Sequence, residues 1–280
     1  MKFSINGTCL EVRNEIDEYN EIIFGRFSQF ELSYDKPYNF LYFKKDKVEI
    51  CLKDKCIVLN NKVIKTDIYT IICNVIAYLI DDEKNMLMHS VVVSKDNIGK
   101  LIIGNFGQGK TTLAKTFEEK GYEINSTDQT WLQIKDNKLY QILGSRFGLN
   151  KENTELLDFY NSNKKIKIEQ IIRIVGLCDE GIVTFNGNNN KYHIIKNLAQ
   201  FCNWNYNLPI FTDNLYLYDT NKYVKIFLEN LSELEIPVLD VRGDKNKILE
   251  ELGVRWKWLK KQHFQKKNYL RKCWTSIVLR

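Results

Sequence analysis

The sequence predicts an α/β fold, with a small β-rich domain over residues 1–85 and a larger domain of alternating strands and helices over residues 86–280. Three observations predict it. Short runs of β-branched and aromatic residues, separated by polar turns, occupy the first part of the chain. Short apolar strands and segments of helical period alternate in the second part. The overall content of 44% hydrophobic residues and three prolines allows a full core and is not typical of disordered or fibrous proteins.

The amino-terminal domain is predicted to contain a small sheet and one helix. Its apolar runs predict strands at residues 2–5, 21–24, 40–43, 48–52 and 57–59. The mostly apolar segment 66–80 predicts a buried helix, with Thr66 or Asp67 as its cap. Its longest apolar run, residues 68–80, is too short to span a bilayer, so nothing in the sequence indicates a membrane protein.

The second domain is predicted to begin with a hairpin. Apolar strands at 91–93 and 101–103 flank the turn sequence of residues 96–99. A second hairpin is predicted around residues 136–138. The other predicted elements are strands at 122–125, 171–177 and 236–239 and helices at 111–120, 150–160, 224–234 and 246–252.

A complete phosphate-binding loop, G-x-x-x-x-G-K-[ST], lies between the strand at 101–103 and the helix at 111–120. A strand, a glycine-rich loop and a helix therefore occur in the order that this motif requires. The loop consists of Gly104, Asn105, Phe106, Gly107, Gln108, Gly109, Lys110, Thr111 and Thr112.

Each residue type in the loop has a chemical reason. Glycines allow the backbone to curl so that several N–H groups point at one anion, and the helix N-terminus adds partial positive charge there. Lys110 can reach the outer phosphates, and the Thr111 hydroxyl can bind Mg²⁺. The sequence therefore predicts that the protein binds a nucleoside triphosphate, with ATP and Mg²⁺ as the expected pair.

Two polar positions are predicted to lie near this loop. His89 comes just before the strand that leads into the hairpin, and Asp128 follows the strand after the loop helix. Both would lie near the edge of the sheet where ligands bind in such folds. A lone histidine is often a hydrogen-bonded core residue, and an aspartate after a strand is often a turn residue, so these simpler roles stay open.

From Met88 to Ile134 the chain resembles the HPr kinase/phosphorylase superfamily. The resemblance consists of His89, the paired strands, the phosphate loop and the segment Gly121–Asp128. It implies an α/β nucleotide-binding core of the HPr kinase C-terminal type, shared with phosphoenolpyruvate carboxykinases, often behind a small variable N-terminal domain. The superfamily includes protein serine kinases and smaller relatives that phosphorylate peptides.

The resemblance also implies roles for particular residues. The loop would hold ATP, with Thr111 on Mg²⁺, and His89 would lie near the transferred phosphoryl group. Asp128 matches the second acid of an acidic pair and would act as general base or metal ligand. Two departures stand out: Thr127 occupies the place of the first acid, and Gly144–Gly148 does not match the Arg-Gly-rich segment that follows in the family.

Asp240 is a rival for the acidic role. It follows the apolar strand Ile236–Leu239, which is typical of the metal-binding aspartate of ordinary P-loop enzymes. The next residues, Arg242–Asp244, resemble strand ends in small-molecule kinases. In those families, however, the phosphate loop usually lies near the N-terminus, whereas about a hundred residues precede it in this chain. No N-K-x-D motif of GTPases and no L-S-G-G-Q motif of ABC ATPases is present.

The net charge of +6 is concentrated in the last 26 residues. Residues 255–280 contain nine Lys or Arg and no acids, so the rest of the chain has a net charge of −3. We interpret this tail as an amphipathic helix that packs aromatic residues on the core. The alternative is a docking surface for an acidic peptide or RNA, but no recognised nucleic-acid module surrounds it.

The seven cysteines show no C-x-x-C spacing, which predicts reduced thiols and a cytoplasmic protein. The sequence as a whole predicts an ATP- and Mg²⁺-dependent kinase that transfers the γ-phosphoryl group to a hydroxyl. The expected acceptor is a Ser or Thr of a peptide or small protein. Two alternatives stay open: a kinase of a sugar, nucleoside or metabolite, and a non-catalytic nucleotide sensor that binds RNA or a partner through its tail. Formation of a homo-oligomer also stays open.

Overall fold

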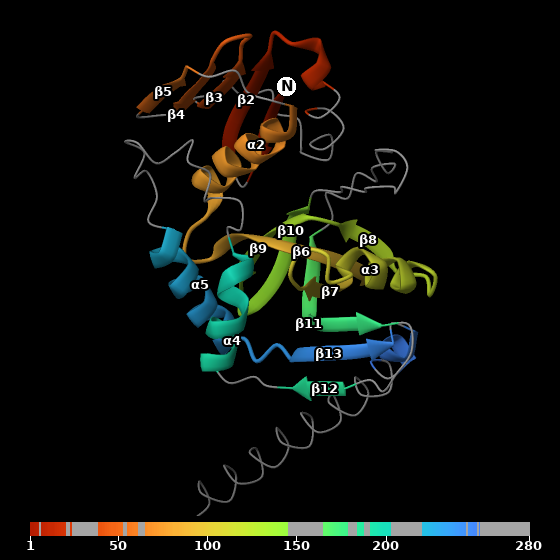
Figure 1. The fold of residues 1–280 in the computed structure, drawn as a ribbon. Helices are drawn as coiled ribbons and strands as arrows, with labels where there is room; N and C mark the ends of the chain where they lie inside the picture. The colour runs from red at the N-terminus through yellow and green to blue at the C-terminus, as the bar shows by residue number, and fades with distance from the viewer. Residues whose placement is uncertain are drawn as a thin grey trace, which may run out of the picture.

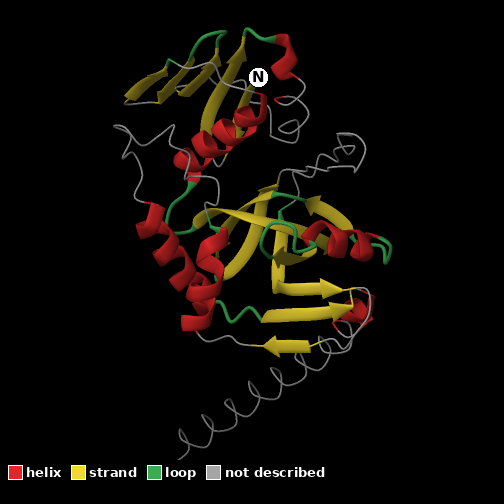
Figure 2. Cartoon of the chain, in the orientation of Figure 1, coloured by secondary structure: helices red, strands yellow, loops and turns green. Residues whose placement is uncertain are grey.

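The computed structural model describes residues 1–5, 7–20, 23, 39–52, 55–60, 65–144, 165–178, 184–187, 191–202, 220–244, 246–250 and 252. These residues form two β-sheets with helices packed against them, which confirms the mixed α/β class (Figures 1 and 2). The predicted helix at 150–160 and the basic tail at 255–280 lie outside the described residues.

The first sheet has five strands in the order β1-β2-β3-β4-β5. All neighbours are antiparallel except β2 and β3, which are parallel. The predictions missed β2, and the predicted strand at 21–24 is wrong at Ile23, which is helical. The bounds are Lys2–Ile5 (β1), Thr8–Asn14 (β2), Asn39–Phe43 (β3), Val48–Leu52 (β4) and Lys55–Leu59 (β5).

Helix α2 (Lys65–Ile80) confirms the predicted buried helix. It covers one face of the first sheet and lies between that sheet and the second one (Figure 1). Its apolar side chains share a core with alternate residues of β2, β3 and β4. Leu87 and Trp131, which belong to the second sheet, join the same core. The two sheets are therefore connected by continuous apolar packing.

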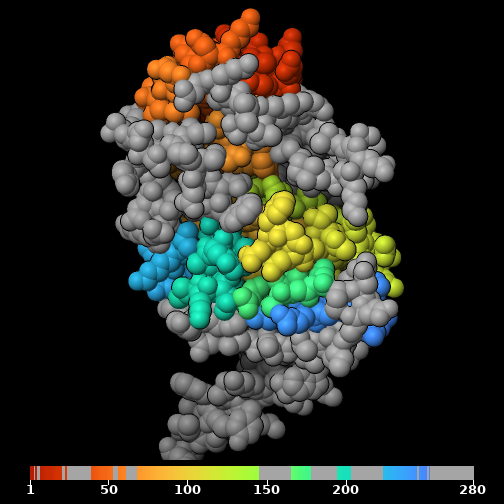
Figure 3. Space-filling view, viewed as in Figure 1, coloured from red at the N-terminus to blue at the C-terminus, as the bar shows by residue number. Residues whose placement is uncertain are grey.

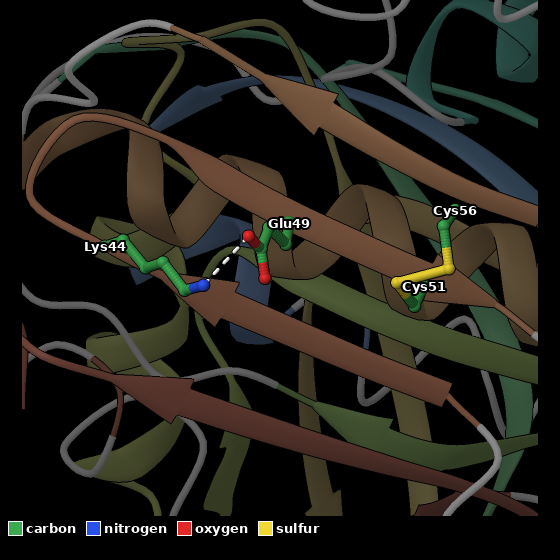
Figure 4. The surroundings of a disulfide bond; sticks show 4 residues. All are labelled: Lys44, Glu49, Cys51 and Cys56. Carbon is green, nitrogen blue, oxygen red and sulfur yellow. Dashed lines mark hydrogen bonds and ion pairs between the residues drawn. A yellow bond between two sulfur atoms is a disulfide. The ribbon is translucent and has the colours of Figure 1, made fainter.

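A disulfide joins Cys51 of β4 to Cys56 of β5 (Figure 4). The two residues are directly opposite each other in the antiparallel ladder, with their Cα atoms 4.0 Å apart. The prediction of reduced thiols is wrong for this pair. Their sequence spacing did not indicate a disulfide, because it is the register of β4 and β5 that sets the two side chains opposite each other. Among the other described cysteines, Cys73 and Cys202 are buried and Cys9 is half-buried.

The second sheet has eight strands. Seven follow the order β10-β9-β6-β7-β11-β13-β12, and β8 pairs with β6. Because β10 also pairs with β11, the strands β10, β9, β6, β7 and β11 form a closed ring. The bounds are Asn85–Lys95 (β6), Ile98–Ile103 (β7), Glu123–Ser126 (β8), Gln129–Lys135 (β9), Lys138–Gly144 (β10), Ile166–Cys178 (β11), Thr184–Gly187 (β12) and Val238–Asp244 (β13).

Both predicted hairpins of the second sheet are confirmed. The β6–β7 turn places Asp96 and Asn97 at φ 54° and 60°, and the β9–β10 turn places Asp136 and Asn137 at 51° and 54°. Asn and Asp tolerate this left-handed conformation better than other side chains, which is why such pairs favour two-residue hairpins.

Helices cover the second sheet on two opposite faces (Figure 1). Helix α3 (Lys110–Glu118) packs on one face, in a core that includes Ile102. Helices α4 (Lys191–Leu198) and α5 (Thr220–Glu233) pack on the other, in a core that includes Leu101 and Ile103. Figure 3 shows the helices α4 and α5 at the molecular surface, in teal and blue. Since successive strand residues point to opposite faces, each residue of β6, β7, β11 and β13 can be assigned to one helix layer.

The predicted helices at 224–234 and 246–252 and the strands at 171–177 and 236–239 are also confirmed, with shifted ends. In the part of the chain that the structure describes, no helix has both the length and the hydropathy needed to cross a membrane.

Candidate functional site

The phosphate loop connects the end of β7 to the start of α3, as the sequence predicts. Gly107 and Gly109 have φ values of 74° and 90°, a left-handed backbone that favours glycine at these positions. Gly109 is the N-cap of α3 and provides no side-chain cap. The first N–H groups of the helix are thus available to an anion, which is the property that this motif uses to bind phosphate.

The loop is held in shape by two reciprocal hydrogen bonds. The backbone N–H of Asn105 donates to Oε1 of Gln108 at 2.6 Å. The backbone N–H of Gln108 donates to the carbonyl of Asn105 at 3.2 Å. The motif allows any residue at positions 105 and 108. In this chain, the backbone of Asn105 and the side chain and backbone of Gln108 form the hydrogen bonds that close the loop. Gln108 therefore has an identifiable role in shaping the site.

Lys110 is buried at the centre of the loop. Its Nζ donates to the backbone carbonyls of Gly104 at 2.9 Å and Asn105 at 3.2 Å. Burial lowers the pKa of Lys110 to about 8, and the carboxylate of Asp128 opposes this decrease. The ammonium group is mostly charged at neutral pH and is held by carbonyl oxygens that phosphate oxygens can replace.

His89 and Asp128 lie beside Lys110, although they come from different elements. His89 is a residue of β6, on the strand face that carries Val91 and Val93 toward α3. Asp128 lies in the turn between β8 and β9. Nε2 of His89 is 3.9 Å from Oδ1 of Asp128, which is beyond hydrogen-bond distance.

The electrostatics show that the three groups form one site. Burial, together with the smaller effect of the positive charge of Lys110, lowers the pKa of His89 to about 4. His89 is therefore neutral at physiological pH. Asp128, whose side chain is 24% exposed, retains access to solvent, whereas the other two side chains are buried. A neutral imidazole, an ammonium group and a reachable carboxylate thus converge on the phosphate loop.

Short polar side chains anchor the turn that carries Asp128. The hydroxyls of Ser126 and Thr130 are hydrogen-bonded at 2.6 Å, and Ser126 Oγ accepts the backbone N–H of Val92 at 2.9 Å. The carbonyl of Asp128 accepts the backbone N–H of Ser90 at 2.9 Å. Sequence reasoning noted Ser126 only as part of the segment that ends at Asp128, and it did not single out Thr130. The available signal was the row of hydroxyl residues Ser126, Thr127 and Thr130 around the aspartate.

The oxygen donors near the loop fit Mg²⁺. Thr111 lies in the first turn of α3 and is half-buried, and Asp128 offers a carboxylate. Mg²⁺ is usually held by one or two such groups together with substrate phosphates and water, rather than by a cage of protein ligands. The described residues contain no cluster of three or more His, Cys, Asp or Glu side chains that could hold a metal ion by themselves.

Asp240 has a different environment from Asp128. Both of its carboxylate oxygens accept hydrogen bonds from Arg173, at 2.7 and 2.5 Å. Arg173 also donates to Asn197 of α4 at 2.7 Å. Strand alternation places Arg173 and Asp240 on the α4 face of the sheet, opposite α3. The structure therefore does not bring Asp240 together with Lys110.

Comparisons with known proteins were made by sequence and by structure. No family model and no curated protein matches the chain. Among solved structures, the HPr(Ser) kinase/phosphatase from Coxiella burnetii is a distant structural neighbour, with a TM-score of 0.36 and 14% sequence identity. The similarity covers 66% of this chain and 97% of that one. Function is therefore inferred below from the geometry of the site.

Proposed function

We propose that this protein is an ATP- and Mg²⁺-dependent kinase that transfers the γ-phosphoryl group to a Ser or Thr hydroxyl of a peptide or small protein. One observation carries the proposal: a complete phosphate loop, its buried lysine and a solvent-accessible aspartate from another strand pair converge at one point. Phosphoryl transfer requires this combination, because catalysis depends mainly on positioning and on neutralising charge.

The chain's own groups account for nucleotide binding. The N–H groups of the loop and of the first turn of α3 would hold the β-phosphate. Lys110 would exchange its two carbonyl acceptors for oxygens of the outer phosphates. Thr111 and Asp128 would hold Mg²⁺, which when bound neutralises phosphate charge and orients the outer phosphates.

Asp128 would act on the acceptor. Its carboxylate would orient the attacking hydroxyl and accept its proton while the hydroxyl oxygen forms a bond to the γ-phosphorus and ADP departs with the electrons of the broken P–O bond. The turn around Asp128 is anchored by Ser126 and Thr130, so the carboxylate is held in place before the substrate binds. His89, neutral and buried 3.9 Å from this carboxylate, would leave its negative charge available to the acceptor.

Incubation of the purified protein with γ-labelled ATP and Mg²⁺ in extract of its source cells tests the proposal. Label should enter a polypeptide with the wild type and not with Lys110→Ala. Lys115→Ala is the matched control, because it removes an exposed lysine one turn further along α3. Label in a small molecule would instead identify a small-molecule kinase. Full activity of Lys110→Ala would contradict the site assignment.

A further inference from the structure

Phe106 is the most exposed large apolar residue in the described part of the chain. Its side chain is 78% exposed, although it belongs to a loop whose neighbouring residues are glycine and polar. Phosphate binding by the loop uses backbone N–H groups and does not require an aromatic side chain at this position. A phenylalanine side chain that solvent reaches can pack on an apolar group of a bound molecule, which removes apolar area from water.

A second exposed apolar residue, Val175, lies at the same edge of the sheet. The β7–β11 ladder ends at the pair Ile103–Arg173, so the residues after them continue side by side. Gly104 packs closely on Ile174: a Cβ added at Gly104 would lie 3.3 Å from the Ile174 Cβ. Val175, the next residue, is 38% exposed and lies at a bulge in the β11–β13 ladder. Phe106 and Val175 are thus two exposed apolar residues at the end of the sheet that carries the phosphate loop, and we call this pair the apolar rim.

The rim lies at the end of the site where the outer phosphates bind. Nζ of Lys110 is hydrogen-bonded to the carbonyl of Asn105, and that carbonyl belongs to the peptide bond between Asn105 and Phe106. Lysine at this position of the motif reaches the outer phosphates. Phe106 therefore borders the phosphoryl group that is transferred, rather than the nucleoside. The molecule that reaches this place during the reaction is the acceptor.

We propose that the rim formed by Phe106 and Val175 binds an apolar side chain of the acceptor and so selects the phosphorylated residue. This inference rests on the proposed function. The acceptor is then a polypeptide segment with a large aliphatic or aromatic residue within two positions of the acceptor Ser or Thr. The residue packs on the ring of Phe106 and brings the neighbouring hydroxyl toward Asp128.

A peptide array tests this inference with the full-length protein. Each peptide carries one Ser, and the flanking positions are occupied by Phe, Leu, Gly, Asp or Lys. Labelling from γ-labelled ATP and Mg²⁺ is measured for wild type, Phe106→Ala, Phe106→Leu and Ile98→Ala. Ile98 is the matched control, because it is an exposed apolar residue (42%) at the opposite end of the same strand. The readout is the ratio of kcat/KM for apolar over glycine peptides within each variant.

We expect wild type to prefer the Phe and Leu peptides by about tenfold or more, through a lower KM for the peptide. Phe106→Ala should reduce the ratio to about two or less, and Phe106→Leu should restore much of it. Ile98→Ala should keep the wild-type ratio. A ratio that persists in Phe106→Ala overturns the inference, as does an array without labelled peptides from a protein that still binds and hydrolyses ATP. Absence of ATP binding by wild type would overturn the proposed function itself.

Discussion

Asp128 and Asp240 both belong to the second sheet, but their surroundings differ in every respect that decides function. Asp128 lies in the turn after β8, whereas Asp240 lies within β13 and not after a strand, where its sequence pattern predicted it. Asp128 lies on the α3 side, near Lys110 and His89, with a side chain that solvent reaches. Asp240 lies on the α4 side, and both of its oxygens are bound by Arg173. The first carboxylate is reached by solvent beside the phosphate loop, whereas the second is committed to an internal ion pair with Arg173.

The contrast teaches that the pattern of a strand followed by an aspartate does not assign a role. What decides is the face of the sheet toward which the side chain points, because the phosphate loop and α3 occupy one face only. A one-residue change of register would exchange the two faces.

Asp128→Asn should lower the rate of phosphoryl transfer by about 10²–10⁴-fold, because the amide cannot accept the proton of the acceptor hydroxyl. ATP affinity should change much less, since the loop and Lys110 supply most of the binding. Single-turnover kinetics and equilibrium binding of a fluorescent ATP analogue measure the two quantities separately. An unchanged transfer rate would remove Asp128 from the mechanism and return attention to Asp240.

Asp240→Asn should act on stability instead. The substitution leaves the guanidinium of Arg173 mostly buried without its charged partner, which we expect to reduce the free energy of unfolding by about 3 kcal/mol. Urea unfolding monitored by circular dichroism measures the loss. At a temperature where the variant is folded, its rate of phosphoryl transfer should stay within about threefold of wild type. If the folded Asp240→Asn variant lost as much activity as Asp128→Asn, the assignment of Asp240 to stability rather than catalysis would be wrong.

His89 should make the protein less stable in acid. Its pKa is about 4 in the folded protein and 6.5 when exposed, so between these values the unfolded chain takes up a proton that the folded chain does not. Stability should therefore fall by up to about 3 kcal/mol as the pH decreases from 6.5 to 4. Urea unfolding across this range, in wild type and His89→Gln, isolates the contribution. If both proteins show the same pH slope, His89 is not the buried base that we describe.

Lys110 should make ATP binding weaker in alkali. Its pKa of about 8 in the free protein is below the ordinary value of 10.5, so the charged form is lost as the pH rises through 8. Binding to phosphate requires the charge, and the affinity for ATP should decrease by up to about tenfold for each pH unit above 8. Titration calorimetry between pH 7 and 9.5 measures this decrease. Lys110→Arg, which stays charged, should show a flat profile over the same range.

Much of the site could be predicted because its central part is local. The phosphate loop is one continuous segment between a strand and a helix, and glycines at 107 and 109 permit the backbone that the motif requires. The two hairpins were predictable for the same reason, since Asp-Asn pairs favour their tight turns. The sequence also predicted His89 and Asp128 beside the loop, although His89 lies within β6 and not just before a strand, because β6 begins at Asn85.

Other features depend on contacts between residues distant in sequence. The pairing of β10 with β11 closes a ring of strands, and the pairing of β4 with β5 sets Cys51 against Cys56. The ion pair of Arg173 with Asp240 joins residues 67 positions apart. None of these leaves a periodic signal in the sequence, because strand partners and registers are selected by the packing of the whole sheet.

The presence of a phosphate loop and its place between a strand and a helix could be predicted from local sequence, because short-range backbone preferences decide both. The tertiary structure alone decided which aspartate faces Lys110, since that depends on the face and register of strands that meet across the sheet. It also decided the pKa values of His89 and Lys110, because burial and the charges of neighbours exist only in the folded chain.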